Sequence, residues 1–303
     1  MALELMAGSK IGVVLSSGGG RGIFGHTGFM LALEALGVLI SASSGCSAGA
    51  VVGGMLASGV PARRWADVVT KVRTKQYWTP RSSWQLLYQF GVHQGRGLKG
   101  LSSTDAAVRY LAEHLLVDSF EACRYPFSAA AINLGTGQKT LFHSGPLALG
   151  IMASAAMAGF YDPVEIDGQY YADGAVIDLA PADAICCRYG LDVLFVHHVA
   201  QRDYSSSQLQ KIFDQPWTIV NVLHLLIYRQ RPWYATGQAR SIHPCPCGCK
   251  AIVVVVEPDL PDLVWPLTEG GAGLVEAAHS HAVEQLQPIL ESIMTDPRGL
   301  LGR

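Results

Sequence analysis

Short apolar runs alternate with longer helical patterns along this chain, which predicts an α/β fold with a parallel sheet. Strands are expected at residues 11–15, 38–42, 127–133, 140–143, 193–196 and 251–256, with a strand ending at 170–172. Helices are expected at residues 29–37, 48–57, 147–158, 181–188 and 272–294. We therefore expect one three-layer α/β/α domain with a mainly parallel central sheet.

The chain shows no clear linker or repeat, so a single domain over residues 1–303 is predicted. Residues 11–200 hold the core motifs, and residues 61–120 form a helical insertion or lid-like region. Residues 201–303 complete the sheet and add the closing helix.

Composition narrows the class of protein. Half of the 303 residues are hydrophobic and 15% are charged, with a net charge of −2, against about 25% charged in an ordinary soluble domain. This excludes a disordered chain and argues against nucleic-acid binding, which favours a basic balance. The longest apolar runs, 251–256 and 217–228, fall short of the roughly 20 residues that a membrane-spanning helix needs.

The N-terminal residues Met1 to Lys10 include Glu4 and lack a basic stretch before an apolar core, so no signal peptide is expected. A cytoplasmic location follows, with peripheral contact to a membrane left open. The seven cysteines are then expected to be mostly reduced thiols.

A glycine-rich loop, Ser16-Ser17-Gly18-Gly19-Gly20-Arg21-Gly22, follows the first predicted strand and leads into a helix. Its backbone N–H groups and the positive helix end suit an anion, either a phosphate or a developing oxyanion. A P-loop is excluded because no Gly-Lys-Ser/Thr follows. A dinucleotide site lacks its acidic residue after the second strand, and a tight turn without function stays an alternative.

The pattern Gly45-Cys46-Ser47-Ala48-Gly49 lies between the second predicted strand and a helix. It matches the nucleophile elbow G-x-S-x-G in sequence and in context, which makes Ser47 a candidate nucleophile. The simpler alternative is an N-cap serine. The elbow comes too early in the chain for an ordinary α/β-hydrolase.

Ser47 needs a general base, and the candidate is Asp173 in the sequence Asp173-Gly174-Ala175, which follows a predicted strand. The ordered set of glycine loop, G-x-S-x-G and D-G-A resembles the patatin-like phospholipase family over roughly residues 11–200. The resemblance implies a Ser47–Asp173 dyad without histidine, and an oxyanion hole from the N–H groups of Gly18, Gly19 and Gly20. It implies that Arg21 and Gly22 shape the loop, and it implies no cofactor.

Alternatives to this hydrolase stay open. A Ser-His-Asp triad stays an alternative, because four histidines follow Asp173 in the sequence: His197, His198, His279 and His281. An acyltransferase or thioesterase would use the same acyl-enzyme. A non-catalytic lipid- or nucleotide-binding protein is the third hypothesis. The acyl-chain preference and the oligomeric state are not predicted.

Positive charge is concentrated with aromatic residues between Arg63 and Arg109, a segment that contains nine basic and two acidic residues. Such a mixture suits an anionic membrane surface, and a solvated helical surface with some buried aromatics is the equal alternative. A second patch surrounds the apolar run 220–227 and consists of Trp217, Tyr228, Arg229, Arg231, Trp233 and Tyr234. It is expected to be a buried core helix, with a lid or an acyl-binding wall as the alternatives.

The cluster His243, Cys245, Cys247 and Cys249 consists of good zinc ligands. Its spacing is C-x-C-x-C rather than C-x-x-C, no second pair follows, and Cys186-Cys187 are distant in sequence. We therefore predict no metal site and expect a reduced turn before the strand at 251–256.

Overall fold

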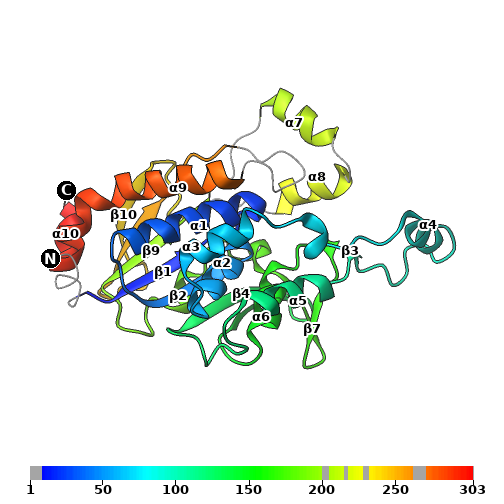
Figure 1. Ribbon diagram of the computed structural model, residues 1–303, viewed down its shortest axis with the longest axis horizontal. Helices are drawn as coiled ribbons and strands as arrows, with labels where there is room; N and C mark the ends of the chain where they lie inside the picture. The colour runs from blue at the N-terminus through cyan, green and yellow to red at the C-terminus, as the bar shows by residue number, and fades with distance from the viewer. Residues whose placement is uncertain (1–8, 200–204, 215–217, 228–231, 262–270, 303) are drawn as a thin grey trace.

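A computed structural model describes residues 9–199, 205–214, 218–227, 232–261 and 271–302. Its central feature is a sheet with the strand order β10-β11-β9-β1-β2-β4-β8-β7, and β5 pairs with β4. The strands β11, β9, β1, β2 and β4 run parallel to one another, and the other strands are antiparallel to their neighbours. The predicted α/β class with a mainly parallel sheet is confirmed (Figure 1).

The strands follow in chain order. They are β1 (Ile11–Leu15), β2 (Ile40–Cys46), β3 (Gly100–Ser102), β4 (Phe127–Asn133), β5 (Lys139–Phe142), β6 (Gly159–Tyr161), β7 (Val164–Ile166), β8 (Gln169–Asp173), β9 (Val193–His197), β10 (Arg240–Pro244) and β11 (Ile252–Val256). Strands β3 and β6 form a separate two-stranded sheet.

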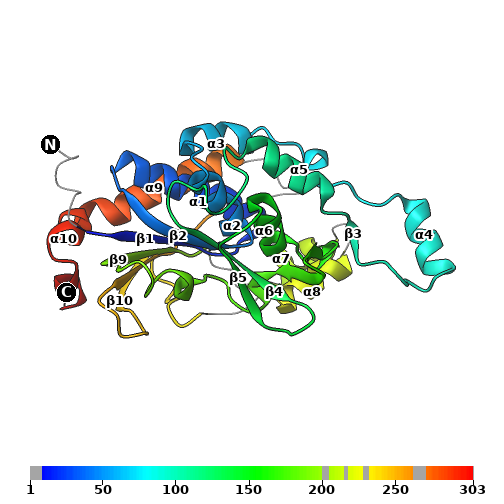
Figure 2. The same ribbon diagram turned by 90° about the horizontal axis from the view of Figure 1, so that it is seen from below.

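The helices are α1 (Gly19–Ala35), α2 (Ala48–Ala57), α3 (Ala62–Val69), α4 (Ser83–Gly91), α5 (Asp105–His114), α6 (Leu147–Ala155), α7 (Ser206–Phe213), α8 (Thr218–Ile227), α9 (Gly271–Leu286) and α10 (Leu290–Thr295). Figure 2 shows α1, α2, α3, α5, α6 and α9 together on one side of the sheet. The other face is covered largely by short 3-10 turns and loops, among them η3 (Gly174–Val176) and η4 (Ala182–Ala184).

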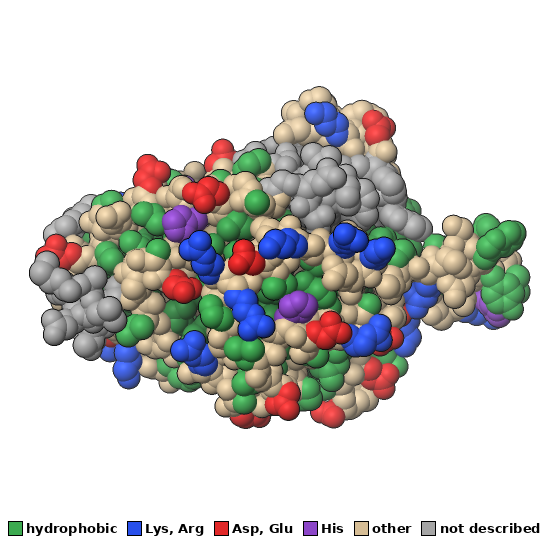
Figure 3. Space-filling view, in the orientation of Figure 1, with side chains coloured by type: hydrophobic (Ala, Val, Ile, Leu, Met, Phe, Trp, Pro, Cys, Tyr) green, Lys and Arg blue, Asp and Glu red, His purple; other side chains and the backbone are tan. Residues whose placement is uncertain are grey.

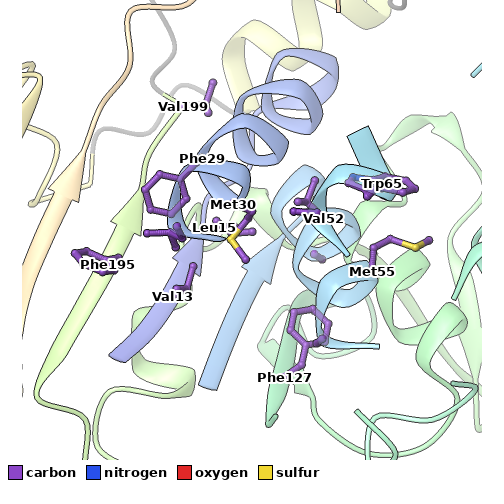
Figure 4. Packing of buried hydrophobic residues seen from close by; sticks show 14 of the residues in the cluster. Val13, Leu15, Phe29, Met30, Val52, Met55, Trp65, Phe127, Phe195 and Val199 are labelled. Carbon is purple, nitrogen blue, oxygen red and sulfur yellow. The ribbon is translucent and has the colours of Figure 1, made fainter. Parts of the chain in front are cut away.

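Alternating side chains of the central strands pack into two cores, as expected for strands buried on both faces. Val13 and Leu15 of β1 belong to the core under the helices, whereas Val14 between them belongs to the core on the opposite face. Figure 4 shows Phe29 and Met30 of α1 directed toward Leu15. Fully burying a side chain of this size contributes about 1.5–3 kcal/mol.

Three of the predicted elements differ from the structure in instructive ways. The helix expected at 181–188 is only the turn η4, where the Pro181 carbonyl accepts the Ala184 N–H at 3.2 Å, the bond of a single 3-10 turn, and also the Ser44 hydroxyl at 2.8 Å. The closing helix ends at Leu286 and resumes as α10, because Pro288 lacks the N–H that a continuous helix needs. The expected strand 38–42 is shifted to Ile40–Cys46.

Helix α8 is not the buried core helix expected at 220–227, since its side chains Ile219 and Leu226 are 74% and 75% exposed. Trp217, Tyr228, Arg229 and Arg231 of that predicted patch lie outside the described residues. Within the described ranges, no helix combines the length and the apolar character needed to cross a membrane.

Candidate active site

The sheet register brings the ends of two distant strands together. Ala130 of β4 pairs with Cys46 at the end of β2, and the next residue, Ala131, pairs with Asp173 at the end of β8. Strand β5 occupies the other edge of β4 at both positions. Strands β2 and β8 therefore meet end to end along one edge of β4, which places Ser47 beside Asp173.

Ser47 lies in a sharp turn between β2 and α2. Its φ of 53° and ψ of −117° fall in a region that costs a non-glycine residue on the order of 1–3 kcal/mol. The flanking glycines permit this turn, because a Cβ on Gly45 would clash with the Gly49 carbonyl and a Cβ on Gly49 with the Leu15 carbonyl. The glycines of the elbow are thus required by close backbone approach.

The Ser47 hydroxyl donates a hydrogen bond to Asp173 Oδ2 at 2.6 Å, and the other carboxylate oxygen accepts the Ala175 N–H at 2.9 Å. The Ser47 N–H donates to Ser154 Oγ at 3.0 Å, and Ser154 Oγ donates to the Ala130 carbonyl at 2.5 Å. Ser154 on α6 therefore fixes the nucleophile turn against β4.

Gly174 follows Asp173 at a point where a Cβ would clash with the Ala130 carbonyl. Only glycine lets the chain turn so close to β4, and this turn presents the N–H of Ala175 to the carboxylate. The D-G-A sequence therefore supplies the carboxylate of Asp173 and also holds it in place through the turn at Gly174.

Asp173 is almost fully buried, with 1% of its surface exposed. Burial is the main cause that raises the pKa of its carboxyl to about 6, and the hydrogen bonds from Ser47 and Ala175 oppose this shift. A carboxylate with a pKa near 6 is ionised at neutral pH and is a stronger base than an exposed aspartate.

The glycine loop lies next to Ser47. Gly18 precedes α1, and Gly19 and Gly20 are its first two residues, whose N–H groups have no carbonyl partner within the helix. Gly19 has a φ of 55°, which favours glycine. A Cβ on Gly22 would lie 2.8 Å from Ala48 Cβ, so this glycine allows α1 to approach α2.

Arg21 is half-buried in the first turn of α1 and does not line the cavity that opens at Ser47. A pair of buried histidines, His26 and His197, supports the glycine loop. His26 Nε2 lies 2.6 Å from the Ser16 carbonyl, so this nitrogen carries the proton, and His26 Nδ1 then accepts from His197 Nδ1 at 2.7 Å. Both rings are buried, and burial lowers the pKa of His26 to about 3.

The placement of the histidines bears on the triad alternative. His197 stacks on Phe29 with a centroid distance of 4.3 Å, and His198 contacts Tyr234 edge-on. Neither histidine lines the cavity at Ser47, and nor do His279 and His281 among the described residues. The Ser47 hydroxyl donates its hydrogen bond to the Asp173 carboxylate and not to a histidine.

A cavity of about 230 Å³ opens at Ser47. Its walls are mainly apolar, and much of them comes from residues between Trp65 and Leu111. The lining includes Gly19, Gly20, Ser47, Val51, Trp65, Val69, Tyr77, Trp78, Tyr110, Leu111, Met152, Ala155 and Phe160. Such a cavity suits a hydrocarbon chain with its polar end at the serine.

The sequence did not reveal Ser154 or His26 as supporting residues. Ser154 stands in a helix of small apolar residues, where a serine often has no special role, and His26 lies within a predicted loop-to-helix region. For Ser154, the available signal was an isolated polar residue in an otherwise apolar helix.

The sequence model of the patatin-like phospholipase family matches residues 13–185. An uncharacterized NTE family protein of Mycobacterium tuberculosis is 31% identical over 174 residues, which are 57% of this chain and 44% of that protein. Lysophospholipase NTE1 of Cryptococcus neoformans is 31% identical over 219 residues, covering 67% of this chain and 12% of its own length. This chain thus spans less than half the length of these relatives.

Among solved structures, human GIVD cytosolic phospholipase A2 superposes with a TM-score of 0.50 at 12% identity, covering 99% of this chain and 63% of that one. This similarity concerns the fold. The family match over residues 13–185 includes the glycine loop, the serine elbow and the D-G-A turn. The chain belongs to the patatin-like phospholipase family.

Proposed function

We propose that this protein is a serine lipid acyl hydrolase that cleaves acyl esters of phospholipids or lysophospholipids. The observation that carries the proposal is the 2.6 Å hydrogen bond to a buried Asp173 from the hydroxyl of Ser47, a residue that lines an apolar cavity. Ser47 Oγ attacks the acyl carbonyl while its proton passes to Asp173. The leaving alcohol takes that proton as the C–O bond breaks.

The second half of the reaction hydrolyses the acyl-enzyme. Asp173 accepts a proton from water, the hydroxide adds to the acyl carbon, and the proton returns to Ser47 Oγ as the fatty acid leaves. The carboxyl is ionised at the start and at the end of the cycle, which its pKa of about 6 allows at neutral pH.

Negative charge on the carbonyl oxygen develops in both steps. Gly19 and Gly20 line the cavity and Gly18 precedes them in the same loop, so their N–H groups are the candidate donors to this oxygen. The positive end of α2, which begins directly after Ser47, acts in the same direction. Each donor to a developing oxyanion contributes about 2.7–4 kcal/mol.

The cavity and the relatives support the proposed substrate class. An apolar cavity lined by Ser47 suits an acyl chain, and the fungal relative is named a lysophospholipase. Release of fatty acid from lysophosphatidylcholine and from diacyl phospholipid is the assay for this class. An added alcohol or thiol acceptor shows whether the acyl group passes to it, as an acyltransferase would require.

Ser47→Ala and Asp173→Asn should each lower turnover by about 10³-fold or more. Ser280→Ala, which changes an exposed serine of α9, is the matched control and should leave turnover unchanged. Full activity in folded Ser47→Ala would reject the proposed nucleophile. A histidine variant as inactive as Ser47→Ala, yet folded, would favour the triad.

We further propose that the protein meets its substrate at an anionic membrane surface through the arm that carries α4. Figure 1 shows α4 projecting from the body, and none of its residues is buried. Trp84, Leu87 and Tyr88 share one face of the helix at i, i+3 and i+4 and are 81%, 63% and 57% exposed. Figure 3 shows hydrophobic side chains gathered at the tip.

Basic side chains occur in the segments before and after α4. The exposed cations from Arg63 to Arg109 are Arg63, Arg64, Lys71, Arg73, Lys75, Arg96, Lys99 and Arg109, whereas Arg81 is half-buried and pairs with Asp162 at 2.7 Å. Exposed cations beside exposed rings are the two elements of an interfacial anchor. The structure also divides the aromatics, since Trp65, Tyr77 and Trp78 line the cavity instead.

Vesicle sedimentation tests this surface. Leu87→Ser should weaken binding to anionic vesicles by about tenfold, since a large apolar side chain contributes about 1.5–3 kcal/mol when buried. Leu39→Ser, at an equally exposed leucine outside the arm (64%), is the control. An equal loss of vesicle binding in both variants would reject the arm as the membrane-binding site. Equal binding of the wild type to anionic and zwitterionic vesicles would reject the electrostatic contribution.

A further inference from the structure

Five cysteine thiols gather at one place on the surface, although they come from two distant parts of the chain. The separations between their Sγ atoms are 2.8 Å for Cys187–Cys247, 3.2 Å for Cys245–Cys247, 3.4 Å for Cys186–Cys187 and 3.9 Å for Cys186–Cys247. The sulfurs of Cys186, Cys187 and Cys247 all lie within 4.8 Å of one another, and so do those of Cys245, Cys247 and Cys249. We call these five residues the cysteine cluster.

The sheet explains why the two segments meet. Val193 of β9 pairs with Ile252 of β11 at the amino ends of two parallel strands, and each cysteine segment precedes one of these strands. The β10–β11 turn is held there by Lys250, whose Nζ lies 2.6 Å from Asp192 Oδ1. Gly248, with a φ of 75°, lets the turn curl. The sequence prediction of an isolated C-x-C-x-C turn did not include this pairing.

The cysteine cluster is more than core packing, and it is not a set of disulfides. Cys186 and Cys245 belong to the second core, but Cys187 and Cys247 are exposed, so their sulfurs do not serve to fill a core. All five thiols are free, and every separation exceeds the ~2.05 Å of a disulfide. His243 is not part of the cluster, because its Nε2 bonds Ser241 Oγ at 2.9 Å and its ring contacts Trp233.

The sulfurs form two groups of three that share Cys247, and each group can supply three corners of a tetrahedral thiolate site. A fourth ligand comes from the other group, since no four of these sulfurs all lie within 4.8 Å of one another. Zinc–sulfur bonds of about 2.3 Å place the corners of such a tetrahedron about 3.8 Å apart, and the observed separations of 2.8–3.9 Å scatter around and below that value. Four thiolate ligands are typical of structural zinc. Cys247 belongs to both groups of three, which makes it the common ligand.

We propose that the cysteine cluster binds one zinc ion through four of its thiolates, with Cys247 among them. Each coordinating thiol releases its proton to solvent on binding. The ion links the β10–β11 turn to the segment that follows Asp173, and it does so at the amino ends of the parallel strands. Ser47 follows the carboxyl end of β2, so the zinc site is independent of the proposed hydrolase site.

Metal analysis of the full-length protein, purified under reducing conditions, tests this site. We expect one equivalent of zinc, and cobalt exchanged into the site should give thiolate charge-transfer absorption. Loss of an outer-shell partner alone costs about 10–100-fold in metal affinity, so Cys247→Ser should lower zinc affinity at least as much. Cys123→Ser removes a half-buried thiol outside the cluster and should retain full zinc.

Three results would overturn the proposal. They are a metal-free wild-type protein whose cluster thiols react freely, a Cys187–Cys247 disulfide in reduced preparations, or an iron–sulfur chromophore in place of zinc. Cys249→Ser provides a second variant where Cys247→Ser fails to fold, and the zinc content of the wild-type protein decides even without variants. Ser47→Ala should keep its zinc, so failure of the hydrolase proposal leaves this test intact.

Discussion

The buried carboxyl of Asp173 should make the folded protein less stable than it would be without that charge. In the unfolded chain the carboxyl has its ordinary pKa of 3.8, and burial raises the folded-state pKa to about 6. The folded protein therefore holds the proton to higher pH than the unfolded chain does. The free energy of unfolding therefore decreases as pH rises from 3.8 toward 6. Above that range the full destabilisation by ionised Asp173 persists.

The magnitude follows from the two pKa values. One pKa unit corresponds to about 1.4 kcal/mol, so ionised Asp173 costs on the order of 3 kcal/mol at pH 8 and about 1.6 kcal/mol at pH 5. Asp173→Asn removes this charge and can retain both contacts, because the amide oxygen accepts from Ala175 and the amide nitrogen donates to Ser47. The variant should be inactive but more stable.

Urea unfolding at both pH values measures the effect. We expect the free energy of unfolding of Asp173→Asn to exceed that of the wild type by a margin that grows by about 1.4 kcal/mol from pH 5 to pH 8. Asp67→Asn, at an exposed position on α3, is the control and should show no such growth. An Asp173→Asn variant that is no more stable than wild type at pH 8, or whose margin is the same at both pH values, would refute this reasoning.

Three further predictions concern the site. The ratio kcat/KM should rise with pH and level off above an apparent pKa near 6, because the base must be ionised; a flat profile from pH 5 to 8 would contradict Asp173 as base. Gly49→Ala should destabilise the fold by about 1–3 kcal/mol in urea, whereas Gly273→Ala, a helix glycine with open space around it, should stabilise it by up to about 1 kcal/mol. Ala155→Leu narrows the cavity and should shift ester hydrolysis toward shorter acyl chains, while Ala148→Leu on the same helix should not, since only Ala155 lines the cavity; unchanged chain preference in Ala155→Leu would exclude this cavity as the acyl site.

Local patterns predicted several elements with their observed bounds. The strands Ile11–Leu15 and Phe127–Asn133 and the helix Ala48–Ala57 agree with the structure, because each is an apolar run with turn residues at its ends. Helix α1 begins ten residues earlier than the predicted residue 29. Its first turn consists of loop glycines, whose low helix propensity concealed it, and packing against α2 and α9 outweighs that propensity.

Long-range pairing was less accessible from the sequence. Ser47 and Asp173 were predicted as partners through the family resemblance, but their contact depends on β2 and β8 sharing one edge of β4, which no local pattern encodes. The cysteine cluster was missed for the same reason, because Cys186 and Cys247 meet only through the pairing of β9 with β11. The separation of the single domain into its predicted parts stays a prediction.

Covalent labelling of Ser47 tests the proposed nucleophile most directly. The protein is treated with a fluorophosphonate, and its intact mass and the labelled peptide are determined by mass spectrometry. We expect one adduct on Ser47, slower labelling of Asp173→Asn, and none on Ser47→Ala. Folded wild-type protein that stays unlabelled, or that carries the adduct on another residue, would contradict the proposal that Ser47, activated by Asp173, is the nucleophile.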